Sequence, residues 1–144
     1  MRELVAETRL HPRQVVAPLF VREGIDAPQP ITSLPGVVQH TRESLVAEVV
    51  QLADLGVGAI ILFGIPSTKD SIGTQAFAPE GIVQAALADC RAAVGDRMVV
   101  MADLCVDEYT DHGHCGIVDQ FGVVDNDRTL DVYAKIAVAQ ARAG

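Results

Sequence analysis

Residues 57–63 (VGAIILF) constrain the fold of this chain more than any other segment does. Nearly every position is apolar, whereas a strand with one face in water alternates apolar and polar residues. A continuous apolar run is typical of a strand that is covered on both faces, and such strands occur mainly in parallel sheets. The run therefore predicts an α/β fold built around a parallel sheet.

Two other runs are strand candidates, residues 14–20 (QVVAPLF) and residues 97–104 (RMVVMADL). Pro18 in the first run indicates an edge or strand-end position, because proline cannot donate a hydrogen bond to a neighbouring strand. Each of the three runs precedes a long polar loop, which in turn precedes a segment with apolar residues at helical spacing. The predicted loops are residues 21–40, 64–78 and 105–126.

The segments after these loops carry signals for helix ends. Thr41 is the predicted N-cap of the first helix, and Gly56 follows its last turn, where glycine is favoured. Pro79 is the predicted first residue of the second helix. The last helix is predicted to be capped by Asn126 or Asp127.

The order strand, long loop, helix occurs three times, with long loops after strands and short loops after helices. This asymmetry is typical of (β/α)8 TIM barrels, whose chemistry lies at the carboxyl ends of the strands. Three units cannot close a barrel of eight, so we expect this chain to be roughly the first three β/α units of a larger domain. Residues 1–13 are the predicted remnant of an N-terminal arm, and residues 14–144 are the predicted barrel part.

A small doubly wound α/β domain is the alternative fold. It would need a glycine-rich phosphate turn directly after a strand, and residues 63–66 (FGIP) are a poor match to one. The sequence contains neither the GxGxxG fingerprint nor a Walker A motif, so the barrel is the favoured prediction.

The chain carries a formal net charge of −8. So acidic a chain lacks the basic surface that binds nucleic acid or an anionic membrane, and we expect neither as a partner. Its three cysteines are an odd number, which argues against a full disulfide framework. No secretory signal is evident, and no apolar run approaches the roughly 20 residues that span a bilayer. We therefore expect a cytoplasmic protein whose free thiols can bind metal.

The candidate site is the segment after the third strand, residues 102–116 (ADLCVDEYTDHGHCG). Cys105 and Asp107 stand two residues apart, so in an extended segment their side chains point the same way. With Cys115 they can present two thiolates and a carboxylate to one ion. Zinc accepts such a set, whereas magnesium prefers oxygen ligands. The alternative is that Cys105 and Cys115 are small buried residues or a redox pair. Cys90 is predicted to be a core residue on the apolar face of a helix.

Four other residues are candidates for chemistry. Asp103 lies at the strand end, where its carboxylate could orient a ligand or a substrate amine, or simply accept a loop hydrogen bond. His112 and His114 are alternative ligands or acid–base groups, or they cap backbone groups. The two lysines, Lys69 and Lys135, are poor candidates for Schiff-base formation, because that role needs a desolvated pocket that lowers the lysine pKa.

The segment ADLCVDEYTDHGHCG resembles the metal-loop signature of the delta-aminolevulinic acid dehydratase (porphobilinogen synthase) family. Other short motifs resemble the same family in the same order, so the resemblance to its N-terminal part runs from about residue 15 onward. These motifs are residues 18–21 (PLFV), 34–37 (LPGV), 62–66 (LFGIP), 81–84 (GIVQ) and 124–127 (VDND).

The resemblance implies a TIM barrel with an N-terminal arm that assembles as a homo-octamer. It implies a lyase (a hydro-lyase) that condenses two aminolevulinate molecules to porphobilinogen in tetrapyrrole (haem) biosynthesis. The family metal pattern C-x-C-x7-C maps onto Cys105, Asp107 and Cys115, and Asp103 matches a catalytic acid beside the metal. The resemblance implies zinc as the metal. Because aspartate replaces the middle cysteine and makes the ligand set harder, magnesium is an additional or alternative metal.

The resemblance also places the two Schiff-base lysines of the family beyond residue 144. We therefore expect this chain to be inactive alone. The alternative function is a non-catalytic metal-binding α/β module, in which His112 or His114 would complete a structural zinc site.

Overall fold

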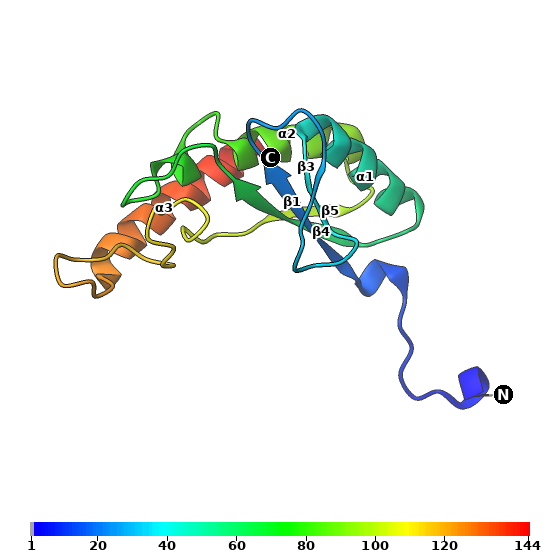
Figure 1. The fold of residues 1–144 in the computed structure, drawn as a ribbon. Coiled ribbons are helices and arrows are strands. Elements are labelled where there is room, and N and C mark those ends of the chain that lie inside the picture. The colour runs from blue at the N-terminus through cyan, green and yellow to red at the C-terminus, as the bar shows by residue number, and fades with distance from the viewer. Residues whose placement is uncertain (1) are drawn as a thin grey trace.

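A computed structural model describes residues 2–144, and Met1, which belongs to the predicted arm, lies outside the described residues. Its centre is a five-stranded sheet with the strand order β2-β3-β1-β4-β5. Helices α1 (Arg42–Asp54) and α2 (Ile82–Val94) lie together over one face of the sheet (Figure 1). Helix α3 (Asn126–Ala143) packs against α2 and the short 3-10 helix η3 (Thr74–Phe77).

The three longest strands form the parallel sheet that the sequence predicts. Strand β4 (Ala59–Ile65) lies between β1 (Val16–Arg22) and β5 (Val99–Ala102), and both pairings are parallel. Each strand leads through a long loop into a helix, so the predicted three β/α units are confirmed.

The predicted loop of residues 21–40 contains two short strands. Strand β3 (Val38–His40) pairs parallel with the end of β1, and β2 (Gln29–Pro30) pairs antiparallel with β3, which makes the sheet mixed. The prediction of an all-loop segment is therefore wrong here. Strands of two or three residues are too short for sequence periodicity to reveal.

Pro18 lies in β1, which has a neighbouring strand on each side. At Pro18 itself, only one of these two strands pairs with β1. Strand β4 pairs with β1 over its whole length, including Pro18 with Ile61. Strand β3 pairs only with Phe20 and Val21. Because β1 has one partner at Pro18, the missing N–H group is tolerated there, as the predicted edge position requires.

The two faces of the sheet differ in burial. Leu19 and Val21 on β1, with Ile60 and Leu62 on β4, are buried beneath the helices. The opposite face is half exposed: the Phe20 and Phe63 rings stack there at 5.2 Å, and Val99 is 60% exposed. Residues 57–63 predict a sheet that is covered on both faces. Among the described residues, helices cover only one of the two faces.

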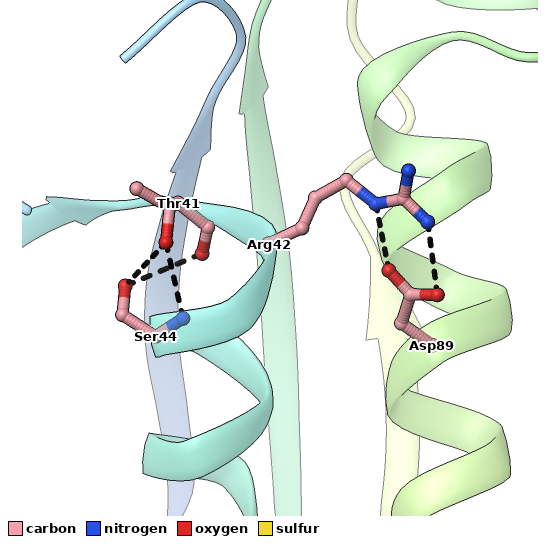
Figure 2. A network of polar contacts seen from close by, with 4 residues as sticks. All are labelled: Thr41, Arg42, Ser44 and Asp89. Carbon is pink, nitrogen blue, oxygen red and sulfur yellow. Dashed lines mark hydrogen bonds and ion pairs between the residues drawn. The ribbon is translucent and has the colours of Figure 1, made fainter. Parts of the chain in front are cut away.

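Helix α1 begins and ends where the sequence predicts. The Thr41 hydroxyl accepts a hydrogen bond from the Ser44 amide at 3.1 Å, and Gly56 beyond the last turn has a φ of 81°. Arg42 in the first turn binds Asp89 of α2 through two hydrogen bonds of 2.7 and 2.9 Å (Figure 2). This pair joins the solvent sides of the two helices that cover the sheet.

Helix α2 begins three residues after Pro79, its predicted first residue. Residues 78–81 form a turn instead, closed by a 3.0 Å hydrogen bond from the Gly81 amide to the Ala78 carbonyl. A side chain at Gly81 would crowd the Gln75 carbonyl, which lies 2.6 Å from where its Cβ would stand. Cys90, on the buried face of α2, is fully buried as predicted, and burial raises the pKa of its thiol to about 11.

Helix α3 is capped one residue before Asn126, the nearer of the two predicted caps. Asp125 is the N-cap, and its carboxylate accepts a 3.0 Å hydrogen bond from the Arg128 amide. Within residues 2–144, no helix combines the length and the apolar character that crossing a membrane would need.

The N-terminal residues extend away from the sheet (Figure 1). Two 3-10 helices, η1 (Arg2–Val5) and η2 (Pro12–Gln14), contain no buried residue. Gly58 lies directly against the Arg13 backbone, where a Cβ atom would collide with the Arg13 carbonyl. Glycine at this position lets the arm pass close to the start of β4.

Candidate metal centre

The candidate site lies in residues 103–125, the ligand loop, which joins β5 to α3. Its first residue, Asp103, extends the sheet by one more bond, a 3.0 Å hydrogen bond from its amide to the Leu62 carbonyl. The Gln140 side chain of α3 donates to the Asp103 carbonyl at 2.7 Å. These bonds fix Asp103 at the carboxyl end of β5. Burial raises the pKa of its carboxyl group, and the nearby Asp107 carboxylate raises it further.

The three ligands predicted from spacing come together. One ligand atom each of Cys105, Asp107 and Cys115 lies within 4.8 Å of the other two. Cys105 and Asp107 are half-buried, whereas Cys115 is exposed, so the group opens toward solvent on the Cys115 side. These three residues, here called the metal group, could hold a metal ion.

The geometry and the donor types fit zinc. Two thiolates bound to a tetrahedral zinc at about 2.3 Å lie about 3.8 Å apart, so only a small inward movement would close the group around an ion. All three cysteines are free, as thiolate ligation requires. Burial raises the pKa of the Cys105 thiol to about 12, so binding an ion here must displace a proton.

The first half of the ligand loop is held by a single tight turn. The amides of Tyr109 and Thr110 both donate to the Val106 carbonyl, at 2.9 and 2.8 Å. The Val106 side chain is fully buried and belongs to the core of the protein. Because Val106 stands between Cys105 and Asp107, its burial anchors the two ligands on either side of it.

The loop after β4 supports the ligand loop through the backbone of Asp70. The Asp70 amide donates to the Tyr109 carbonyl at 3.3 Å, and the Asp111 amide donates to the Asp70 carbonyl at 3.1 Å. The Asp70 carboxylate accepts bonds from the Thr74 hydroxyl and from the amides of Ile72 and Thr74, which lower its pKa. Asp70 thus braces its own loop while its backbone pairs with the ligand loop.

The two histidines hold the turn of the ligand loop rather than joining the metal group. His112 Nδ1 accepts from the His114 amide at 3.1 Å, so Nε2 carries the proton and donates to the Ser71 carbonyl at 3.2 Å. The His114 ring is exposed and lies 5.4 Å from the His112 ring. Of the interpretations that the sequence leaves open, capping of backbone groups fits His112.

Tyr133 of α3 holds the second half of the loop. Its hydroxyl donates to the Cys115 carbonyl at 2.7 Å and lies 3.7 Å from the Cys105 sulfur. Tyr133 is not among the residues predicted for the site, because in the sequence it is one of the apolar residues of a predicted helix face. A tyrosine on such a face is itself a signal, because its hydroxyl usually finds a polar partner when it is buried.

Three further charged side chains are Glu108, which the sequence does not single out, and the two candidate lysines. Burial raises the pKa of Glu108, with a further increase from Asp107, while Lys69 acts in the opposite direction. Lys69 is exposed, and the exposed Lys135 lies with its Nζ 5.5 Å from the centre of the Phe77 ring. Neither lysine occupies the desolvated pocket that Schiff-base formation needs.

Comparison with known proteins identifies what this arrangement resembles. The family model described as delta-aminolevulinic acid dehydratase matches residues 1–144. Curated proteins of that name are 55% identical in Streptomyces coelicolor, 52% in Mycobacterium tuberculosis and 47% in Bacillus subtilis. Each match covers the whole of this chain and 44% of the relative, so the chain spans less than half the length of these relatives.

A solved structure has the same arrangement of elements. It is the delta-aminolevulinic acid dehydratase (porphobilinogen synthase) of Toxoplasma gondii, in complex with the reaction product porphobilinogen. The match has a TM-score of 0.94 and 32% sequence identity, and it covers 99% of this chain and 41% of that one. The three β/α units are therefore part of a TIM barrel, as the sequence predicts.

Proposed function

We infer that this chain, which belongs to the delta-aminolevulinic acid dehydratase family, supplies the metal side of a site that condenses two aminolevulinate molecules to porphobilinogen. The single observation that carries the proposal is the group of Cys105, Asp107 and Cys115 at the carboxyl end of a barrel strand. Catalytic groups of TIM barrels lie at this end of the strands. The reaction is that of a lyase in haem biosynthesis.

Zinc is the proposed metal, held by Cys105, Asp107 and Cys115. Two thiolates favour zinc over magnesium, while the carboxylate makes the set harder than three thiolates and leaves magnesium as the alternative or additional ion. A zinc ion in this place would act as a Lewis acid on a substrate carbonyl. The exposure of Cys115 leaves that side of the group open to a substrate.

Asp103 is the proposed catalytic residue of this chain. Its backbone is fixed by hydrogen bonds to Leu62 and Gln140. Its carboxyl group is half-buried, and both burial and the nearby Asp107 charge raise its pKa. A carboxyl group with a raised pKa can hold a substrate amine by a hydrogen bond and exchange a proton with it. Asp103 would therefore orient the amine beside the metal ligands.

The amine nucleophiles of the reaction would come from outside these 144 residues, since neither Lys69 nor Lys135 lies in a desolvated pocket. The complete enzyme is proposed to be a cytoplasmic homo-octamer, with residues 1–13 as part of an N-terminal arm and residues 14–144 as part of the barrel. A reducing compartment suits the proposal, because the metal ligands must remain free thiols.

The first test is metal content. The purified protein is expected to bind about one zinc per chain, and Cys115→Ser is expected to lose most of it. Cys90→Ala is the matched control, because Cys90 is buried in the core away from the metal group. Equal zinc content in all three proteins would contradict the assignment of the ligands.

The second test is turnover. Porphobilinogen formation from aminolevulinate is expected to be at background level for these 144 residues alone. Clear turnover by the same polypeptide would show that Lys69 or Lys135 acts as an amine nucleophile, and would overturn the proposed division of the site.

The alternative of a non-catalytic module with a structural zinc receives no support from the comparisons. It also needs His112 or His114 as a fourth protein ligand, and both His112 ring nitrogens already bond to the backbone. A structural zinc site would unfold on metal removal, which a circular dichroism spectrum with and without chelator would reveal.

A further inference from the structure

Tyr133 connects the two cysteines of the metal group from a separate element. Its hydroxyl lies 2.7 Å from the Cys115 carbonyl oxygen and 3.7 Å from the Cys105 sulfur. The two cysteines are ten positions apart in the ligand loop, and Tyr133 is in α3. One side chain on a helix therefore contacts both thiol-bearing residues of the loop that would close around an ion.

The helix that carries Tyr133 is itself fixed to the loop. One turn earlier, the Thr129 hydroxyl accepts a 2.9 Å hydrogen bond from the Ile117 amide and donates to the Asp125 carbonyl at 2.6 Å. Gly116 packs so closely on Thr129 that a Cβ atom would lie 2.9 Å from the Thr129 hydroxyl. The position of the Tyr133 hydroxyl is thus set by the packing of α3 against Gly116 and Ile117, the two residues that follow Cys115.

We propose that Tyr133 is a positioning residue for the metal, whose hydroxyl donates to the Cys105 sulfur when that sulfur is a thiolate ligand. This inference rests on the proposed function, because it assumes that Cys105 binds the metal. A hydroxyl has one proton to donate, and in the structure the carbonyl of Cys115 is the nearer acceptor. A thiolate is charged, and hydrogen bonds to charged acceptors are about twice as strong as neutral ones.

Two effects follow for a protein that has lost the hydroxyl. The affinity for zinc is expected to fall by about 10- to 100-fold, the usual result of removing a group that orients a metal ligand. The thiolate would also lose a hydrogen bond that stabilises its lone pairs. Charge transfer from that sulfur to a bound metal then requires less energy, so the corresponding absorption band moves to longer wavelength.

The experiment uses cobalt(II) as a spectroscopic probe in the protein and in Tyr133→Phe. The thiolate-to-cobalt band of the variant is expected at longer wavelength, and competition with a chromophoric chelator is expected to show the weaker zinc binding. Tyr109→Phe is the matched control, because Tyr109 is the only other tyrosine and its hydroxyl lies against Gly64 rather than a sulfur. The control is expected to keep the wild-type band.

A second variant separates a direct bond to sulfur from a general loosening of the loop. Thr129→Val removes the hydroxyl that binds the Ile117 amide, but it keeps the Tyr133 hydroxyl and the volume of the side chain that packs on Gly116. It is expected to weaken zinc binding without moving the cobalt band. A band in Tyr133→Phe that coincides with the wild-type band would overturn the proposal, whatever the change in affinity. A thermal unfolding curve of each metal-free variant checks that the fold is retained.

The same measurements distinguish failure of this inference from failure of the proposed function. If the wild-type protein shows no thiolate-to-cobalt band, Cys105 is not a ligand, and both proposals are wrong. If the wild-type band is present and depends on Cys105, but not on Tyr133, only the role of Tyr133 is wrong.

Discussion

The helix-covered side of the sheet and the ligand loop are held together by different forces. Beneath α1 and α2 the contacts are apolar, and Leu45, Val49 and Leu62 are fully buried. The ligand loop is held mainly by hydrogen bonds, to the loop after β4 on one side and to α3 on the other. Most of the folding free energy therefore comes from the helix-covered side. Substitution of the ligand residues in the loop is expected to cost little stability.

Three residues limit this separation. The ligand-loop residues Val106, Tyr109 and Ile117 have side chains that are buried in the core. They fix the loop directly after Cys105, at Tyr109, and two residues after Cys115. The segment between Tyr109 and Ile117, which carries Cys115, can adjust around an ion while its ends stay in place.

The largest expected effect tests the helix-covered side. Leu45→Ala in α1 is expected to lower the free energy of unfolding by about 3 kcal/mol, because it leaves a cavity at a fully buried site. Leu55→Ala is the matched control at the end of the same helix, where the side chain is 72% exposed, and it is expected to change stability by less than about 0.5 kcal/mol. Urea unfolding monitored by circular dichroism measures both.

The same variant also tests whether the two regions are separable. Below its unfolding transition, Leu45→Ala is expected to give the wild-type cobalt spectrum, because α1 contributes none of the proposed ligands. A changed spectrum in the folded variant would mean that the packing under the helices sets the geometry of the metal group.

The next effect tests the ligand loop. Asp107→Cys turns the group into three thiolates, and zinc affinity is expected to rise by about tenfold or more, which is about 1.4 kcal/mol of binding free energy. Chelator competition with zinc and with magnesium measures the change and its selectivity. The stability of the metal-free protein is expected to stay within about 0.5 kcal/mol of wild type, since Asp107 is only half-buried. A large loss of stability would contradict the separation of the two regions.

The sequence predicts the helix-covered side better than the loop, for a physical reason. Periodicity and caps are local signals, so the three long strands and the start of α1 at Thr41 could be read from neighbouring residues. The late start of α2 could not, because the turn at Pro79 depends on close packing of Gly81 against Gln75. Strands β2 and β3 are too short to leave a periodic signal.

In the metal group the sequence predicts the ligands but not their supports. The spacing of Cys105, Asp107 and Cys115 is local, and the structure brings these three residues together. Asp70 and Tyr133 lie far from Cys105 along the chain, and each reaches the loop only because the fold brings its element there. A single sequence can mark such a residue as unusual, but it does not show which distant residue the side chain contacts.

A smaller effect concerns the polar contact between the two covering helices. Arg42 and Asp89 form two hydrogen bonds with each other, yet the Arg42 side chain is about half exposed. Exposed ion pairs of this kind contribute at most about 1 kcal/mol, and we expect a coupling free energy of about 0.5 kcal/mol. A double-mutant cycle with Arg42→Met and Asp89→Ala measures it. A coupling well above 1 kcal/mol would show that polar contacts also hold the helix-covered side.

The smallest effect is a difference in pH dependence between the two regions. Burial lowers the pKa of His40, which lies 8% exposed at the end of β3, with its Nδ1 3.2 Å from the Ser44 hydroxyl. The unfolded chain therefore binds more protons than the folded one below about pH 6.5, and stability falls as the pH drops through that range. In the ligand loop, burial raises the pKa of Asp103 and Glu108. These two carboxyl groups therefore act in the opposite direction, and lower the free energy of unfolding as the pH rises above about 4.

Urea unfolding of the metal-free protein from pH 5 to pH 8 tests the contribution of the histidine. As the pH falls, His40→Gln is expected to lose less free energy of unfolding than wild type. Identical curves would mean that His40 contributes nothing to the pH dependence of stability in this range.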